Sequence, residues 1–252
     1  MNAARTLLER LSRGRVLRRR LPTEFGGAPM LVSPDASLSY WKPGLRSDLF
    51  EFADEFVDAG SVVWDIGANV GLLTMAAAQR SGAQGQVVAV EADTWLAALV
   101  ARSAAMQPET SAPIQVVPAA VYSELGVGRF HVAQRGRAMN HLEVAGGAPE
   151  AGGVRATMHL VTITLDWLLQ QGRAPQVVKV DVEGAEADVL NGAQRLLAEV
   201  KPVILCEVYE KNAESVTRTL REHGYALYDW ESHPRARVER ACYNTLALPE
   251  AR

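Results

Sequence analysis

The chain has 252 residues, of which 48% are hydrophobic and 22% are charged, and its formal net charge is −3. This length suits one large α/β domain with an N-terminal extension, and so weak a net charge excludes nucleic acid as a bulk electrostatic partner. Two cysteines cannot form a disulfide framework, and no apolar run reaches the ~20 residues that span a bilayer.

The N-terminal stretch is rich in arginine and poor in acids. Its arginines lie at positions 5, 10, 13, 15, 18, 19 and 20, and only Glu9 opposes them. We expect a helix from Leu7 to Leu21, interrupted at Gly14, in an arm that lies on the domain or frays. A transit peptide, a basic helix on a membrane or acidic partner, and a pairing arm of a homodimer are the alternatives. No apolar core of a signal peptide is present, so we expect a cytoplasmic location.

A strand, a glycine turn and a helix follow in succession from Val62. The run Val62–Trp64 is apolar on both faces, as in a strand buried between helix layers, and Ser47–Asp58 before it has an apolar helical face. The turn reads Asp65-Ile-Gly-Ala-Asn-Val-Gly71, and a good helix former begins at Leu72. This combination predicts a ligand-binding turn at the carboxyl edge of an α/β sheet.

The acid in this turn discriminates between ligands. A dinucleotide turn has the pattern G-x-G-x-x-G, whereas here Asp65 replaces the first glycine, and a carboxylate repels a pyrophosphate. The same carboxylate favours a ligand with an ammonium group. A second apolar strand, Gln86–Val90, ends at Glu91, which suits the two hydroxyls of a ribose. Asp65 and Glu91 together indicate S-adenosylmethionine (SAM) and disfavour an NAD-type oxidoreductase.

Later strands also end in acids. Val177–Val180 leads to Asp181, and Val203–Cys206 leads to Glu207. Because the carboxyl ends of parallel strands share one edge of a sheet, we expect these acids to lie near Asp65 and Glu91. The last strands, expected at 225–230 and 242–248, form an antiparallel hairpin that closes the sheet.

These motifs resemble the FkbM family of SAM-dependent methyltransferases. The resemblance depends on the Asp65–Gly71 turn, on Glu91, and above all on Lys179-Val-Asp-Val-Glu-Gly-Ala-Glu186 after Thr164-Leu-Asp-Trp-Leu-Leu169. It covers roughly residues 55 to 248. It implies a class I methyltransferase fold: a Rossmann-like, seven-stranded, mostly parallel sheet with helices on both faces. We therefore assign residues 1–54 to a basic arm and cap segment and 55–252 to the methyltransferase domain.

The resemblance also implies site residues. The expected cofactor-binding residues are Asp65, Gly67, Ala68, Asn69, Gly71, Glu91, Ala92, Ala120 and Asp181. In this family the N-terminal segment covers the cofactor site, so Tyr40 is a candidate for acceptor contact. The long stretch from Gln134 to Gly153 has no clear period, which is typical of a lid or of disorder, and its Asn140 and His141 are further candidates for acceptor contact.

Three acids are candidates for catalysis. Asp181 is expected to lie nearest the methyl group, and Glu183 and Glu207 to supply a base or line the acceptor pocket. Lys179 is expected to form a structural ion pair with Asp166 or Glu183. Some O-methyltransferases hold a divalent cation between acids at these strand ends, but two acids are too few to define a metal site, and we assign no metal ligand.

The sequence thus predicts SAM-dependent O-methylation of a hydroxyl on a small molecule, such as a sugar or natural product. Alignment of donor and acceptor is the main task of the protein in such a reaction, because the leaving group is already activated. The alternatives are an N-methyltransferase and a SAM-fold protein that binds without catalysis. Neither the acceptor nor the oligomeric state follows from these residues.

Overall fold

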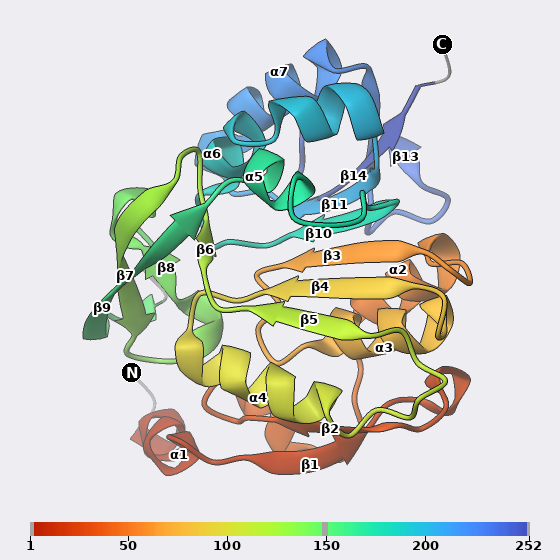
Figure 1. Cartoon of the computed structure of the whole chain (residues 1–252). Coiled ribbons are helices and arrows are strands. Elements are labelled where there is room, and N and C mark those ends of the chain that lie inside the picture. The colour runs from red at the N-terminus through yellow and green to blue at the C-terminus, as the bar shows by residue number, and fades with distance from the viewer. Residues whose placement is uncertain (1–2, 148–150, 251–252) are drawn as a thin grey trace.

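The computed structural model describes residues 3–147 and 151–250. Its centre is an eight-stranded sheet with the order β13-β12-β14-β11-β10-β3-β4-β5 (Figure 1). The strands are β3 (Val62–Ile66), β4 (Gln86–Val90), β5 (Ile114–Val117), β10 (Val177–Val180), β11 (Val203–Glu207), β12 (Tyr225–Asp229), β13 (Ala236–Arg237) and β14 (Asn244–Pro249).

The sheet confirms the predicted class. Strands β5, β4, β3, β10 and β11 are parallel, whereas β14 lies antiparallel between β11 and β12. The strand count differs by one from the seven expected, because the two-residue β13 pairs with the edge of β12. The chain order reverses between β3 and β10, so the crevice at that point of the carboxyl edge is where an open α/β sheet binds its ligand.

Alternate side chains of the central strands enter two separate cores. Val63 and Val87 pack with helices α2 (Asp48–Phe56), α3 (Leu72–Ser81) and α4 (Thr94–Ala104) on one face. Trp64 and Val88 pack on the other face, against α5 (Leu165–Leu169), α6 (Glu186–Asn191), a π-helix (Leu196–Val200) and α7 (Ala213–Glu222). The strands are apolar on both sides for this reason, and the helices on both faces are as predicted.

A second sheet is inserted between β5 and α5. It has the order β6-β9-β7-β8 and lies beyond the carboxyl ends of the central strands (Figure 1). Its strands are β6 (Ala120–Val121), β7 (Gly126–Ala133), β8 (His141–Leu142) and β9 (Val154–Ile163). The stretch expected to be a lid or disordered therefore contains β8 and two 3₁₀ turns, Arg137–Met139 and Glu143–Ala145, although residues 148–150 lie outside the described part.

The N-terminal segment differs from the single interrupted helix that we expected. Helix α1 (Ala3–Ser12) ends two residues before Gly14, whose φ is +65°, and the chain returns as strand β1 (Leu17–Arg20). This strand pairs antiparallel with β2 (Pro29–Val32), and β2 packs against α4. Three 3₁₀ turns, Thr23–Phe25, Leu38–Trp41 (η2) and Glu210–Asn212, complete the elements outside the inserted sheet.

The assigned boundary between residues 54 and 55 falls inside α2. Side chains from before it, including Phe25 and Met30, share one core with the sheet residues Val63 and Val87. The N-terminal segment is thus packed onto the domain over much of its length. Within 3–147 and 151–250, no helix is long and apolar enough to cross a membrane.

Candidate active site

Two cavities open at the carboxyl edge of the sheet and meet at Asp181. The first is bounded by the turn after β3, the end of β4, strand β6 and the inserted sheet. The second lies between the start of α2, the ends of β10 and β11, Trp230 and Asn244. Asp181 lines both cavities, so a group bound in one would lie next to a group bound in the other at this residue.

Gly67 allows the turn after β3 to approach the exit of β10. Its backbone N–H donates to the carbonyl of Val90 at 2.9 Å, and its φ is +74°. A Cβ atom at this position would lie 1.7 Å from the carbonyl oxygen of Asp181. Only glycine fits here, because both the backbone conformation and the contact exclude a side chain.

Gly71 and Ala68 support this turn from behind. Gly71 has a φ of +83° at the start of α3, and a Cβ there would lie 3.3 Å from the methyl groups of Val100. Ala68 is buried and donates its backbone N–H to Val90. Neither residue lines the two cavities, so their contribution to the site is the shape of the turn.

Asp65 does not line the cavities either, in contrast to the expected direct contact with the ligand. Its side chain is buried below the turn, where Oδ2 accepts hydrogen bonds from the backbone N–H of Thr74, at 3.0 Å, and from the Thr74 hydroxyl. Its Oδ1 lies 3.7 Å from Nζ of Lys179. The carboxylate therefore holds the first turn of α3 and faces a buried cation.

Lys179 is the central cation of the site. Its Nζ donates to the carbonyl of Gly67 at 2.7 Å and pairs with Oδ2 of Asp181 at 3.0 Å. Burial acts to lower the pKa of Lys179, but the carboxylates of Asp181 and Asp65 outweigh it and raise this pKa. The predicted structural role fits this geometry, whereas the predicted partners were wrong: Asp166 instead accepts the backbone N–H groups of residues 195 and 196.

Glu91 lines the first cavity from the end of β4. Its two carboxylate oxygens accept the backbone N–H groups of Asn69, at 2.7 Å, and Asp93, at 2.8 Å. Burial raises the pKa of Glu91 to about 7 against these hydrogen bonds. Ala92 and Ala120 line the same cavity, as expected for residues beside a bound nucleoside.

Asn69 has a polar atom without a partner. Its backbone adopts a φ of +53°, and its side chain reaches the first cavity. Its Oδ1 is buried and accepts no hydrogen bond from any described residue. This atom has no accessible surface toward the cavity, and the expected role of Asn69 in cofactor binding stays a prediction.

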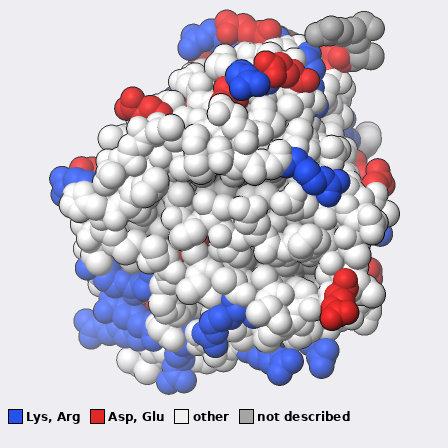
Figure 2. All heavy atoms as spheres, in the orientation of Figure 1, with Lys and Arg blue, Asp and Glu red and all other residues white. Residues whose placement is uncertain are grey.

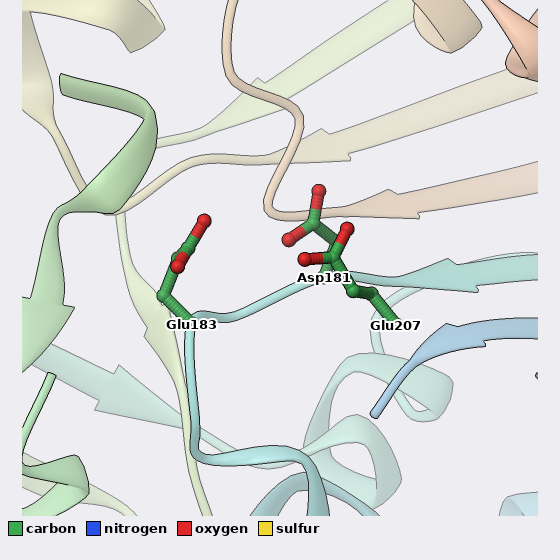
Figure 3. Close-up of side chains that lie close together, drawn as sticks. All are labelled: Asp181, Glu183 and Glu207. Atoms are coloured by element: carbon green, nitrogen blue, oxygen red, sulfur yellow. The ribbon is translucent and has the colours of Figure 1, made fainter. Parts of the chain in front are cut away.

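Asp181, Glu183 and Glu207 form a carboxylate cluster beyond the ends of β10 and β11 (Figure 3). One oxygen from each lies within 4.8 Å of the others. The hydroxyl of Tyr209 donates to Glu183, and the hydroxyl of Tyr243 donates to Glu207. Burial and the neighbouring Asp181 charge raise the pKa of Glu183 to about 8 and that of Glu207 to about 7.

The sequence predicted that these acids would meet, but it missed part of the cluster. We expected two acids to be available for a cation, whereas Glu183 adds a third. Carboxylate oxygens are the ligands that divalent cations such as Mg²⁺ prefer, so these three residues are the ones that could hold such an ion. The hydrogen-bond partners Tyr209 and Tyr243 were also missed. Tyr209 follows Glu207 by two residues and could have been found from the sequence, whereas Tyr243 comes close only because β14 pairs with β11.

The inserted sheet forms the opposite wall of the first cavity. Phe130 and Leu142 give this wall an apolar surface. Arg137 lies beside them, 2.9 Å from Asp35 of the N-terminal segment, and it also pairs with Asp93 at the start of α4. No sequence signal marked Arg137, because its partners are far apart along the chain.

The expected acceptor contacts occupy different positions. Asn140 lines the first cavity, but its amide accepts the N–H of Ala133 and donates to Asp93, each within 2.8 Å, so this side chain fixes the inserted sheet. His141 does not line the cavities; its ring packs against His131 at 5.5 Å between centroids. A role of His141 in acceptor contact stays a prediction.

Tyr40 lies on η2 and outside the two cavities. Its backbone carbonyl accepts a hydrogen bond from Arg19 at 2.9 Å. Burial raises the pKa of its phenol to about 12, with the Lys179 charge acting in the opposite direction. The phenol is thus within electrostatic range of the site, and a role in acceptor contact stays a prediction.

A comparison with protein families identifies one match. The family model of the methyltransferase FkbM domain matches residues 65–227, which is more than half of the chain. The matched segment contains the turn after β3, Glu91 and the whole carboxylate cluster. A comparison with curated proteins gives no match.

Three solved methyltransferase structures have a backbone similar to that of this chain. A FkbM methyltransferase from Methylobacillus flagellatus KT shows 15% identity and a TM-score of 0.48, over 79% of this chain and 50% of that one. Precorrin-6y C5,15-methyltransferase from Geobacter metallireducens GS-15 shows 13% identity and a TM-score of 0.47, over 81% and 89%. A 16S rRNA N2 G1207 methyltransferase from T. thermophilus, solved with AdoMet and guanosine, shows 16% identity and a TM-score of 0.46, over 94% and 50%.

Proposed function

Because the chain belongs to the FkbM family of SAM-dependent methyltransferases, we propose that it transfers the methyl group of SAM to a hydroxyl of a small molecule. The single observation that carries this proposal is the meeting of two cavities at Asp181, next to two carboxyl groups with raised pKa values. A transferase needs adjacent places for donor and acceptor, and a hydroxyl acceptor needs a group that takes its proton.

The residues around the first cavity fit SAM. Glu91 has the charge and the position to accept hydrogen bonds from ribose hydroxyls, and the apolar wall of Phe130 and Leu142 suits an adenine ring. The carboxylate of Asp181 suits the ammonium group of the methionyl part. SAM supplies an electrophilic methyl group on a sulfonium whose leaving group is neutral.

The acceptor belongs in the second cavity, where Glu207 is the proposed base. This carboxyl group lines the cavity together with Asp181, and its pKa of about 7 allows it to take a proton near neutral pH. Tyr243 holds it by a hydrogen bond, and Lys179 pairs with Asp181 beside it. Glu207 would take the acceptor proton as the bond between the acceptor oxygen and the methyl carbon forms and the carbon–sulfur bond of SAM breaks, and the proton would then pass to solvent.

The charge of the site narrows the acceptor. Asp181 is paired with Lys179, and the pKa values of Glu183 and Glu207 are raised, so the junction of the cavities carries little net charge and gives little attraction to a phosphate or carboxylate next to the reacting hydroxyl. A neutral polyol or a cationic acceptor is compatible with this field. We therefore infer a neutral acceptor hydroxyl, of the kind found on sugars and natural products.

The test combines binding and turnover. Isothermal titration with S-adenosylhomocysteine measures the cofactor site, and methyl-labelled SAM with fractionated cell extract measures transfer, followed by identification of the methylated atom. Glu207→Gln is expected to leave S-adenosylhomocysteine affinity unchanged and to lower transfer at least ~100-fold. Glu210→Gln, an exposed acid on the same segment, serves as the control and is expected to behave as the unmodified protein.

Three outcomes would decide against the proposal. Absence of binding to S-adenosylhomocysteine would remove its basis. Binding without labelling of any fraction would favour the alternative of a SAM-fold binding protein. Label found on nitrogen would show an N-methyltransferase, for which the base has a smaller part in the reaction.

A further inference from the structure

Helix α1 is amphipathic, and its apolar face points outward. Ser12 is buried and the side chain of Glu9 is only 13% exposed, so the polar side of the helix lies against the protein. Leu7 and Leu11 lie away from this side and are 58% and 49% exposed, and Leu8, one turn before Ser12, is 47% exposed. A surface helix of a globular protein normally has the reverse orientation, so this ridge of leucines indicates an interaction surface.

The orientation of α1 is held by specific contacts. The indole N–H of Trp41 donates to the Ser12 hydroxyl at 2.8 Å, and the guanidinium of Arg15 lies 5.7 Å from the Trp41 ring. The backbone N–H of Gly14 donates to Asp35 at 3.3 Å. Trp41 is itself 37% exposed next to the helix. The leucines are therefore presented outward by a docked helix that is held at its C-terminal end.

The same region is strongly basic. Residues 5–20 contain seven arginines and one glutamate, a net charge of +6 in a chain whose overall net charge is −3. All of these arginines except Arg19 are exposed. Figure 2 shows the basic side chains gathered at the lower left and along the lower edge, where Figure 1 places α1 and β1. Exposed leucines within a basic surface match the pattern of a helix that lies in a membrane interface.

We propose that α1 and β1 dock the protein on the surface of a membrane that contains anionic lipids. The leucines and Trp41 would enter the boundary between headgroups and acyl chains, while the arginines meet lipid phosphates. A second copy of the chain is a poorer occupant, because two such surfaces would bring like charges together. Nucleic acid would account for the arginines but leaves the three exposed leucines without a partner.

The docking surface is independent of the proposed methyl transfer, although the two are connected in the fold. Helix α1 packs on η2, which carries Tyr40, and Arg19 of β1 donates to the carbonyl of Tyr40. The test below uses binding alone, so its failure would not affect the methyltransferase assignment.

The experiment is co-sedimentation of the full chain with lipid vesicles. Vesicles of phosphatidylcholine are compared with vesicles that also contain phosphatidylglycerol, and binding is expected only to the second. Raising the salt concentration from about 0.1 M to about 0.5 M is expected to weaken binding at least ~10-fold, because it screens the arginines. Nuclease treatment of the protein beforehand excludes bound nucleic acid.

Two variants separate the apolar and the basic contributions. Leu7→Ser/Leu8→Ser/Leu11→Ser and Arg10→Glu/Arg13→Glu/Arg18→Glu are each expected to lose at least ~10-fold in vesicle affinity. Their folding is checked by circular dichroism and by S-adenosylhomocysteine binding. The matched control, Leu125→Ser/Val127→Ser/Val161→Ser, removes similarly exposed apolar side chains near or within the inserted sheet and is expected to bind as the unmodified protein does.

Several results would overturn the proposal. Equal binding to neutral vesicles would exclude recognition of anionic lipid, and equal loss in the control variant would exclude α1 as the surface. If sedimentation velocity shows a dimer that the leucine variant dissociates, a second copy covers this face. Tighter binding to short RNA or DNA duplexes than to vesicles would assign the arginines to nucleic acid.

Discussion

Replacing Lys179 by methionine tests the electrostatic arrangement at the centre of the site. The side chain is 6% exposed, and its Nζ lies 3.0 Å from Asp181 and 3.7 Å from Asp65. With an effective dielectric constant of ~20, the closer pair alone corresponds to about 5 kcal/mol of attraction before desolvation is subtracted. Methionine keeps the volume of the stem but leaves both carboxylates unbalanced.

The expected loss in the free energy of unfolding is about 3 kcal/mol. Removing one partner of a buried ion pair costs about 3–5 kcal/mol, and we place this variant at the lower end because the side chain of Asp181 is 27% exposed and water can compensate it in part. Domains of this kind have a total stability of about 5–15 kcal/mol, so the variant should still fold.

Urea denaturation at neutral pH measures this loss. Lys42→Met, at an exposed lysine, is the control and is expected to change stability by less than ~0.5 kcal/mol. The double variant Lys179→Met/Asp65→Asn should recover part of the loss, because it removes one of the unbalanced charges. A loss below ~1 kcal/mol, or a double variant less stable than Lys179→Met, would refute the reasoning.

Five further outcomes are expected. Gly67→Ala should abolish S-adenosylhomocysteine binding in calorimetry, because its Cβ would overlap the carbonyl of Asp181. The value of kcat/KM should rise with pH and level off above about 7, the pKa of Glu207, and Glu207→Gln should lack this inflection. The pKa of Glu207 is raised in the folded state, so the contribution of Glu207 to the free energy of unfolding falls as the pH rises from about 5 to about 7. Over this interval the Glu207→Gln variant should therefore lose less stability than the unmodified protein. Methyl transfer should persist in EDTA, because Lys179 and the protons that the carboxyl groups keep at their raised pKa values already compensate the charge of the carboxylate cluster. A loss of transfer in EDTA that Mg²⁺ restores would contradict this prediction. Arg137→Ala should weaken S-adenosylhomocysteine affinity about 10-fold by releasing the inserted sheet from Asp93.

The parts of the fold that could be predicted are those with a local pattern. Apolar runs that end in an acid marked β3, β4, β10 and β11, because strands buried on both faces need continuous apolar sequence. The inserted sheet was harder to predict: its outer face is exposed, so β7 and β9 lack such a run, and β8 has only two residues. Strand β1 was mistaken for helix because Leu17 was grouped with the leucines of α1, although it follows Leu11 by six residues, a spacing that would place the two on different sides of a helix.

Single residues of the site were also hard to predict where their position depends on parts of the chain that are distant in the sequence. Sequence spacing places an acid at a strand end, but it does not say which way the carboxylate turns. Asn140 and His141 were chosen because their segment had no period, yet strand pairing buries both against other parts of the inserted sheet. Tyr243 and Arg137 act through partners more than thirty residues away, which no local pattern reports.

Asp65 illustrates how a motif can predict the right ligand for a different reason. Its charge was expected to meet the ammonium group of SAM, whereas the structure turns it toward Thr74 and Lys179. Lys179 in turn pairs with Asp181, the carboxylate that lines both cavities. The acid in the turn thus acts on the ligand indirectly: it supports Lys179, whose partner Asp181 lines the first cavity together with Glu91 and Glu183.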